Sequence, residues 1–144
     1  RDARLAAQRE GRTADWYVAR SLSQPFVGLL NEGATCYLNS LLQVLFMLAD
    51  VRREVFSFEF SRVLHGEATR CLPLQLSRLF AHMQCGSRRT LSVRPLIHSL
   101  GWSHAEASVQ HDVHELCRLL LASLADRGVR VAERLFEGEL LCTL

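Results

Sequence analysis

Hydrophobic residues recur at helical spacing in four stretches of the chain. The first begins at Cys36, with Thr35 as its expected N-cap, and the second covers residues 73–83. A short third helix is predicted over 93–100, and the fourth and most regular runs over 112–125. These patterns predict a mostly helical chain. The buried face of the fourth helix is expected to contain Val113, Leu116, Cys117, Leu120, Leu121 and Leu124.

The two ends of the chain differ from this helical middle. Residues 1–24 are polar and rich in arginine, and we expect them to form a lead-in segment to the domain over residues 25–144. Residues 135–142 alternate loosely between apolar and polar, which predicts an edge strand. Because a lone strand needs a sheet to pair with, we expect its partners to lie after Leu144 and the chain to be cut at both ends.

Composition and charge exclude several classes of protein. The 144 residues are 49% hydrophobic and 22% charged, which suits one globular domain with a core rather than a disordered chain. A net charge of +2 is too small to indicate a nucleic-acid partner, and the lack of a long apolar stretch indicates no membrane partner. The five cysteines form no CxxC pair, so we expect free thiols and a cytoplasmic or nuclear location.

The sequence around Cys36 carries the strongest chemical signal. A thiol in the first turn of a helix lies at the positive end of the helix dipole, which favours the nucleophilic thiolate. The amide groups of that turn and the side chain of Asn31 could then stabilise an oxyanion. A small buried cysteine beside an ordinary cap is the alternative. The polar residues on both sides of the thiol, within residues 31–40, favour the nucleophile.

Three motifs give the sequence a family resemblance. The segment 28–43, GLLNEGATCYLNSLLQ, resembles the Cys box of the ubiquitin-specific proteases. Residues 110–116 are similar to the family's Gln-x-Asp-x-x-Glu motif, and residues 135–138 to its Leu-Phe-x-Gly. The wording around the three motifs, including residues 101–102 and 116–118, is most similar to the herpesvirus-associated branch. The resemblance covers residues 24–144. It implies an α+β papain-like cysteine protease fold, with residues 25–144 supplying the Cys box, the helical thumb and the first strand of the fingers.

The resemblance also implies roles for individual residues. Cys36 would be the nucleophile, and Asn31 would stabilise the oxyanion. Gln110, Asp112 and Glu115 would bind the C-terminal tail of ubiquitin, whose arginines can pair with carboxylates. Asp112 and Glu115 also fit a helix-capping pattern, and one residue could serve both purposes. The implied activity is removal of ubiquitin, with ubiquitin and ubiquitinated proteins as partners and no metal or other cofactor.

The chain departs from the family in one respect, and two other functions stay open. The family's catalytic His and its Asp or Asn partner belong to a C-terminal box that has no counterpart here, so we expect little activity from this stretch alone. One alternative is a metal site formed by His111, Asp112, His114 and Glu115, with His104 upstream. The other is a catalytically inactive ubiquitin-binding or scaffold protein. Retention of both the thiol and the oxyanion residue favours the enzyme.

Overall fold

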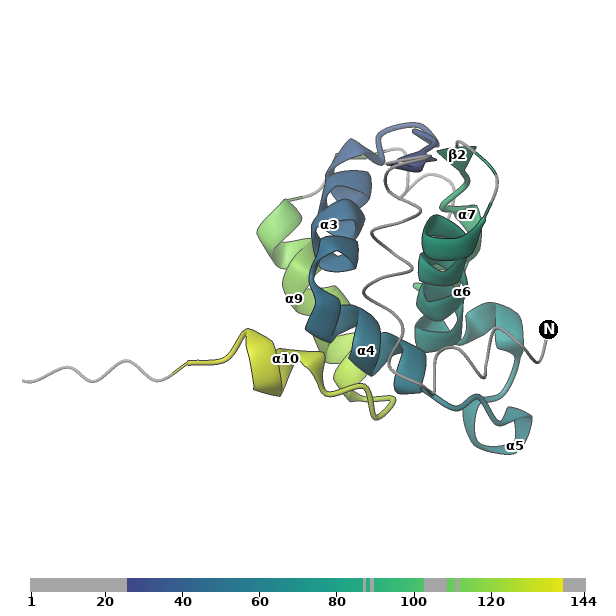
Figure 1. The fold of residues 1–144 in the computed structure, drawn as a ribbon, viewed down its shortest axis with the longest axis vertical. Helices are drawn as coiled ribbons and strands as arrows, with labels where there is room; N and C mark the ends of the chain where they lie inside the picture. The colour runs from purple at the N-terminus through teal and green to yellow at the C-terminus, as the bar shows by residue number, and fades with distance from the viewer. Residues whose placement is uncertain (1–25, 87, 89, 103–108, 111, 139–144) are drawn as a thin grey trace, which may run out of the picture.

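The computed structural model describes residues 26–86, 88, 90–102, 109–110 and 112–138. Helices make up most of this part of the chain, and two short strands lie at one end of the helices (Figure 1). The predicted lead-in segment, residues 1–24, lies outside the described residues. In chain order the elements are β1 (Gly28–Leu29), α3 (Cys36–Met47), α4 (Ala49–Ser57), α5 (Arg62–His65), the 3-10 turn η1 (Ala68–Arg70), α6 (Leu72–Cys85), β2 (Thr90–Leu91), α7 (Arg94–Ser99), α9 (Val113–Ala125) and α10 (Val131–Leu135).

The core lies between α3, α4, α6 and α9. Each of these helices turns a stripe of apolar residues inward, at the three- and four-residue spacing read from the sequence. The rings of Phe46 and Phe80 meet edge to face with centroids 5.4 Å apart, and both are buried. Burying one such side chain contributes about 1.5–3 kcal/mol, so this contact area holds the helices together. The largest fully buried residues include Leu38, Leu42, Leu45, Leu72, Leu76, Phe80, Leu120 and Leu124.

The four predicted helices are confirmed as α3, α6, α7 and α9. Gly86 follows α6 as its C-cap, and Asp112 caps α9. The predicted inner face of α9 is wrong at its first residue, because Val113 is 48% exposed. Val113 lies in the first turn, ahead of the part of α9 that is buried in the core from Leu116 onward.

The β1–β2 pair was not predicted from the sequence. The two strands run parallel, with Gly28 opposite Thr90 and Leu29 opposite Leu91. The amide of Leu30 continues the ladder with a 2.9 Å hydrogen bond to the Leu91 carbonyl. This pairing brings the segment before α3 beside the segment before α7, which are about sixty residues apart in the chain.

The prediction of a strand over residues 135–142 is wrong for the part that the structure describes. Leu135 is the last residue of α10, and residues 136–138 form no strand. Val131 is fully buried, and Arg134 forms an ion pair with Glu54 of α4. These contacts hold the segment as a helical turn against α4 and α9. Residues 139–142 lie outside the described part.

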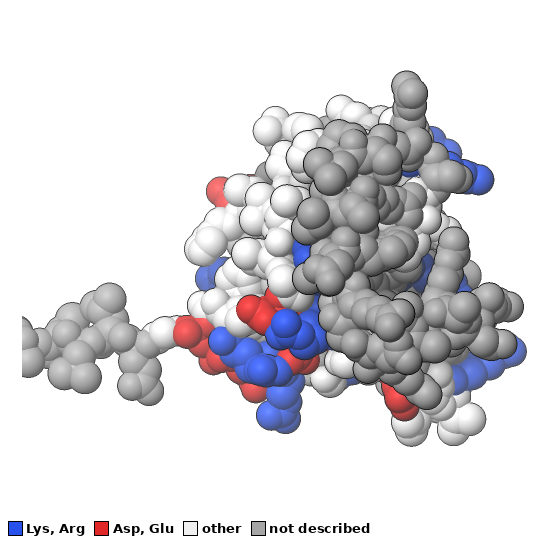
Figure 2. Space-filling model, in the orientation of Figure 1, with Lys and Arg blue, Asp and Glu red and all other residues white. Residues whose placement is uncertain are grey.

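The charged side chains on the face shown in Figure 2 are of both signs. Arginines and acids lie next to one another in the region of α4 and α10. This region is therefore not a patch of one sign of charge that could attract a strongly charged partner. Its ion pairs are Asp50–Arg53, Arg130–Glu133 and Arg134–Glu54. Within the described ranges, no helix has the length and apolar character needed to cross a membrane.

Candidate active site

Cys36 is the first residue of α3, and it is exposed. None of the described side chains caps the amide groups of this first turn. Backbone N–H groups at a helix N-terminus point along the axis and attract negative charge. The predicted placement of the thiol in the first turn of a helix is therefore confirmed.

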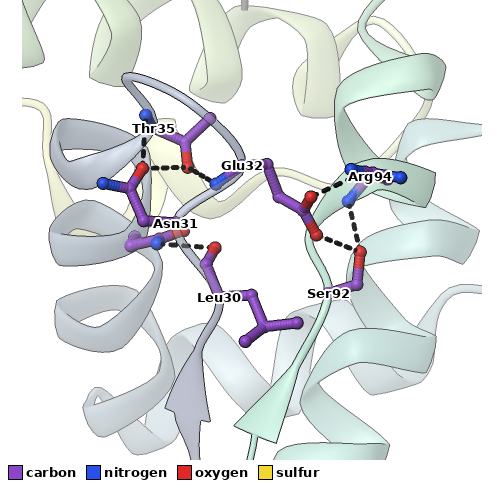
Figure 3. Close-up of polar contacts among 7 residues, drawn as sticks. Leu30, Asn31, Glu32, Thr35, Ser92 and Arg94 are labelled. Atoms are coloured by element: carbon purple, nitrogen blue, oxygen red, sulfur yellow. Dashed lines mark hydrogen bonds and ion pairs between the residues drawn. The ribbon is translucent and has the colours of Figure 1, made fainter.

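The loop before the thiol is closed by hydrogen bonds between Asn31, Glu32 and Thr35 (Figure 3). The side-chain oxygen of Asn31 accepts from the Thr35 backbone N–H at 3.0 Å and from the Thr35 hydroxyl at 3.1 Å. The same hydroxyl accepts from the Glu32 backbone N–H at 3.0 Å. Both bonds to Asn31 go to its oxygen, and neither uses the NH₂ end of the carboxamide, which can only donate.

Thr35 stands at the N-cap position of α3, but its side chain does not cap the helix. The predicted position of the N-cap at Thr35 is therefore correct, but the expected hydrogen bond between its side chain and the helix is absent. The physical reason is that the hydroxyl turns back to the loop, where it bonds to Asn31 and Glu32. Thr35 is fully buried, so its hydroxyl bonds to these loop residues and not to solvent.

A second set of contacts ties the loop to the start of α7. The carboxylate of Glu32 accepts from the Ser92 hydroxyl and from the Arg94 Nε, each at 2.6 Å (Figure 3). The hydrogen bond from Ser92, and then the charge of Arg94 with its hydrogen bond, hold the pKa of Glu32 below its usual value. The Glu32 side chain is only 10% exposed, whereas that of Arg94 is 76% exposed.

Glu32, Ser92 and Arg94 were missed by the reading of the sequence. Glu32 and Arg94 lie 62 residues apart, and only the pairing of β1 with β2 brings them together. An acid in the nucleophile loop and an arginine before the proline of α7 were the available signals. Neither indicates the other without the strand pairing.

The predicted ubiquitin-tail residues lie at the start of α9. Oδ1 of Asp112 accepts from the backbone N–H groups of His114 at 2.7 Å and Glu115 at 3.2 Å. These two bonds, first that from Glu115, lower the pKa of Asp112 below its usual value. The capping role of Asp112 is thus confirmed. Gln110, Asp112 and Glu115 are all exposed, so a partner can reach them.

The structure brings the Cys box and this acidic motif onto neighbouring helices. Helices α3 and α9 pack against each other, and α9 runs beside α3 in Figure 1. The ring of Tyr37, next to the thiol, lies 6.5 Å from that of Trp102, which precedes α9 in the chain. Burial, and then the charge of the neighbouring Cys36, raise the pKa of Tyr37. Tyr37 is thus part of the core between the two motifs rather than a titrating group.

The alternative of a metal site receives no support from the described ranges. In them, no group of three or more His, Cys, Asp or Glu residues is placed to hold a metal ion. His104 and His111, which this alternative requires, lie outside those ranges. His114 and Glu115 are exposed on the first turn of α9.

Comparison with known proteins gives consistent matches. Residues 27–141 match the family described as "Ubiquitin carboxyl-terminal hydrolase". Ubiquitin carboxyl-terminal hydrolase 47 of Homo sapiens is 36% identical over 144 residues, which cover 90% of this chain and 10% of that protein. Ubiquitin C-terminal hydrolase 13 of Arabidopsis thaliana is 38% identical over 118 residues, covering 78% and 10%. Ubiquitin carboxyl-terminal hydrolase 7 of Drosophila melanogaster is 36% identical over 102 residues, covering 71% and 9%.

The chain spans about a tenth of the length of these relatives. The family match and the mostly helical architecture with one short parallel strand pair confirm the predicted α+β papain-like class. They also agree with a fragment that contains the helical thumb of such a fold. The chain belongs to the ubiquitin carboxyl-terminal hydrolase family, among its ubiquitin-specific proteases.

Proposed function

We propose that the protein is a cysteine-dependent deubiquitinase that hydrolyses the isopeptide bond after the C-terminal glycine of ubiquitin. The observation that carries this proposal is the exposed thiol of Cys36 at the start of α3. It follows a loop in which the oxygen of Asn31 is fixed by two hydrogen bonds from Thr35. A nucleophile, a helix N-terminus and an amide donor thus come from one short segment. Family membership supports the same activity.

In the proposed mechanism, the Cys36 thiolate attacks the carbonyl carbon of the last glycine of ubiquitin. The C–S bond forms while the carbonyl becomes an oxyanion, which the NH₂ group of Asn31 and the backbone N–H groups of α3 stabilise. The C–N bond then breaks, and the substrate lysine leaves as an amine after it takes up a proton. Water hydrolyses the resulting thioester, which releases ubiquitin with a free carboxylate and restores the thiol.

The proton for the leaving amine needs an imidazole. The family resemblance assigns that role to none of the six histidines of this chain. We therefore expect these 144 residues to turn over little substrate by themselves. The full natural protein is the form in which we expect activity, in the cytoplasm or the nucleus.

The exposed acids at the start of α9 would bind the tail of ubiquitin. Asp112 uses Oδ1 for both of its backbone bonds, and its carboxylate remains exposed. Glu115 and Gln110 lie beside it in the sequence and are also exposed. Carboxylates pair with the arginines of the ubiquitin tail through charge-assisted hydrogen bonds, so we assign these three residues to tail binding.

The proposed function also has consequences for the domain to which the chain belongs and for its binding partners. We propose that residues 1–24 lead into a catalytic domain of which residues 25–144 are the N-terminal part. We place the chain close to the herpesvirus-associated branch, on the wording around its three motifs, including residues 101–102 and 116–118. Its partners would be ubiquitin and ubiquitinated proteins, with no cofactor and no nucleic-acid or membrane ligand.

The test is covalent labelling of the full natural protein by ubiquitin that carries an electrophile at its C-terminus, read by intact mass. We expect one adduct with the wild-type protein and none with Cys36→Ala. Cys117→Ala is the matched control, because burial raises the pKa of that thiol and it should not react. An adduct that survives Cys36→Ala would contradict the nucleophile assignment. Ubiquitin binding without any adduct would favour the inactive scaffold.

A further inference from the structure

Thr35 forms three hydrogen bonds within residues 31–35, the loop before Cys36 that we call the nucleophile loop. Its hydroxyl donates to Asn31 Oδ1 at 3.1 Å and accepts from the Glu32 amide at 3.0 Å. Its own amide donates to the same Oδ1 at 3.0 Å. Thr35 is fully buried, whereas Asn31 is exposed. One buried residue therefore controls the orientation of an exposed carboxamide.

The chemistry of these contacts selects one of two orientations. A carboxamide can turn by a half rotation, which exchanges its oxygen and its NH₂ group at little intrinsic cost. The Thr35 backbone N–H can only donate, so the exchanged orientation would place two donors against each other. The hydroxyl accepts from Glu32 and has its single proton left for Asn31. Both donors of Thr35 therefore require the oxygen of Asn31 to face them.

We propose that Thr35 is a positioning residue, which holds the NH₂ group of Asn31 as the donor to the oxyanion. This rests on the deubiquitinase function proposed above. Two of the three hydrogen bonds end on the carboxamide of Asn31, and the third, from the Glu32 amide, stays within the same loop. None of them involves the acids at the start of α9, so loss of the hydroxyl should slow the chemical step without weakening the binding of ubiquitin. Figure 3 shows the carboxamide nitrogen of Asn31 on the side away from these bonds.

The first experiment measures kcat and KM of the full natural protein with ubiquitin that carries a fluorogenic amide. Thr35→Val removes the hydroxyl and keeps the shape and the backbone N–H, and we expect kcat to fall about tenfold with KM unchanged. Thr35→Ser keeps the hydroxyl and should restore most of kcat. Thr69→Val makes the same chemical change at an exposed site in η1 and should have no effect.

A double-mutant cycle separates positioning from general damage. If Thr35 acts through Asn31, Thr35→Val should have no further effect on kcat in the Asn31→Ala background. A tenfold loss in both backgrounds, or a kcat within twofold of wild type for Thr35→Val, would overturn the proposal. A wild-type protein that forms no Cys36 adduct would instead refute the proposed function.

Asn31→Asp tests the same geometry even where Thr35→Val fails to fold. A carboxylate keeps an oxygen for both donors of Thr35 but has no NH₂ group. We expect its melting temperature to stay within about 2 °C of wild type, while kcat falls at least a hundredfold. A loss of 5 °C or more would show that the nitrogen, not the oxygen, faces Thr35, and would overturn the proposal.

Discussion

Glu32→Gln is the perturbation that tests how the nucleophile loop is anchored. Glu32 is the acid of the loop, and it accepts 2.6 Å hydrogen bonds from Ser92 and Arg94. The two donors bond to different oxygens of the carboxylate, and glutamine, which has the same length, keeps only one oxygen as an acceptor. The substitution therefore removes the negative charge and one acceptor with little change in shape. The effect on stability therefore reports the charge of Glu32 together with one of its two hydrogen bonds.

The magnitude follows from the exposure of the two partners. The Arg94 side chain is 76% exposed, so solvent screens its ion pair with Glu32, which should contribute about 0–1 kcal/mol. The Glu32 side chain is 10% exposed but Ser92 is an exposed residue, so water reaches the bond between them from the Ser92 side. A hydrogen bond to a charged group contributes about 1.5–3 kcal/mol against about 1 kcal/mol for a neutral one. We expect Glu32→Gln to lower the free energy of unfolding by about 1–2 kcal/mol at pH 7.

The pH dependence gives the sign of the effect. The pKa of Glu32 in the folded protein is lowered from its ordinary value of 4.5, chiefly by the hydrogen bond from Ser92. A lowered pKa means that the charged carboxylate stabilises the fold above about pH 4.5. This contribution is lost as the pH falls through the lowered pKa. The difference between wild type and Glu32→Gln should thus be constant near neutrality and should shrink below pH 4.5.

The assay is urea unfolding of both proteins, followed by tryptophan fluorescence from pH 7 to pH 3. Asp50→Asn is the matched control, because Asp50 pairs with Arg53 on the surface of α4 with side chains that are 59% and 74% exposed. We expect that control to change stability by less than about 0.5 kcal/mol. A Glu32→Gln difference that persists or grows on acidification would refute the electrostatic account of the anchor.

Three further predictions concern the core, a helix end and the acidic motif. Leu42→Ala should lower the free energy of unfolding in urea by about 2–5 kcal/mol, because Leu42 is fully buried. Val44 is 59% exposed, so Val44→Ala should lower it by less than about 0.5 kcal/mol, and equal losses would contradict this packing. Gly86→Ala should cost about 1–3 kcal/mol, because its Cβ would lie 2.4 Å from a backbone oxygen of α6, while Gly138→Ala, in open space, should leave the melting temperature unchanged. Asp112→Asn keeps an oxygen for the cap but loses the charge, so ubiquitin affinity measured by calorimetry should fall about tenfold at constant melting temperature. A fall in melting temperature with unchanged affinity would show a capping role only.

Three of the four predicted helices have a long buried stripe, whereas the short α7, with two buried residues, is marked by Pro95 in its first turn. In α9, Leu116, Leu120 and Leu124 repeat every four residues and are buried. Helix α4 was missed because only Val51 and Val55 of its nine residues are buried. Two buried positions give too short a pattern to distinguish a helix from a loop. Packing of α4 against α3 and α6 supplies the rest of its stability.

The residues of the site were predictable only as far as the chemistry is local. Cys36 and Asn31 lie five residues apart in one short segment, and both are exposed. The contacts that fix the loop depend on β1 and β2, each of two residues, and strands of that length leave no periodic signal. At the C-terminal end, the loose alternation over residues 135–142 suggested a strand, but packing of Val131 makes the turn up to Leu135 helical.

The polar residues of the leucine-rich helix α3 form hydrogen bonds to the segment that precedes it, which accounts for their presence near the thiol. Asn39 donates to the Leu30 carbonyl at 3.1 Å, and Gln43, one turn later, donates to the Val27 carbonyl at 2.8 Å. The extended segment that contains β1 pairs with β2 on one side, so these side chains bond it to α3 as well. The loop that ends at Cys36 is thereby held at its start by α3 and, through Glu32, by Ser92 and Arg94 in the segment leading into α7. The exposed thiol of Cys36 thus follows a loop that is hydrogen-bonded both to α3 and to the segment before α7. Such fixing is what the proposed stabilisation of an oxyanion by Asn31 would require.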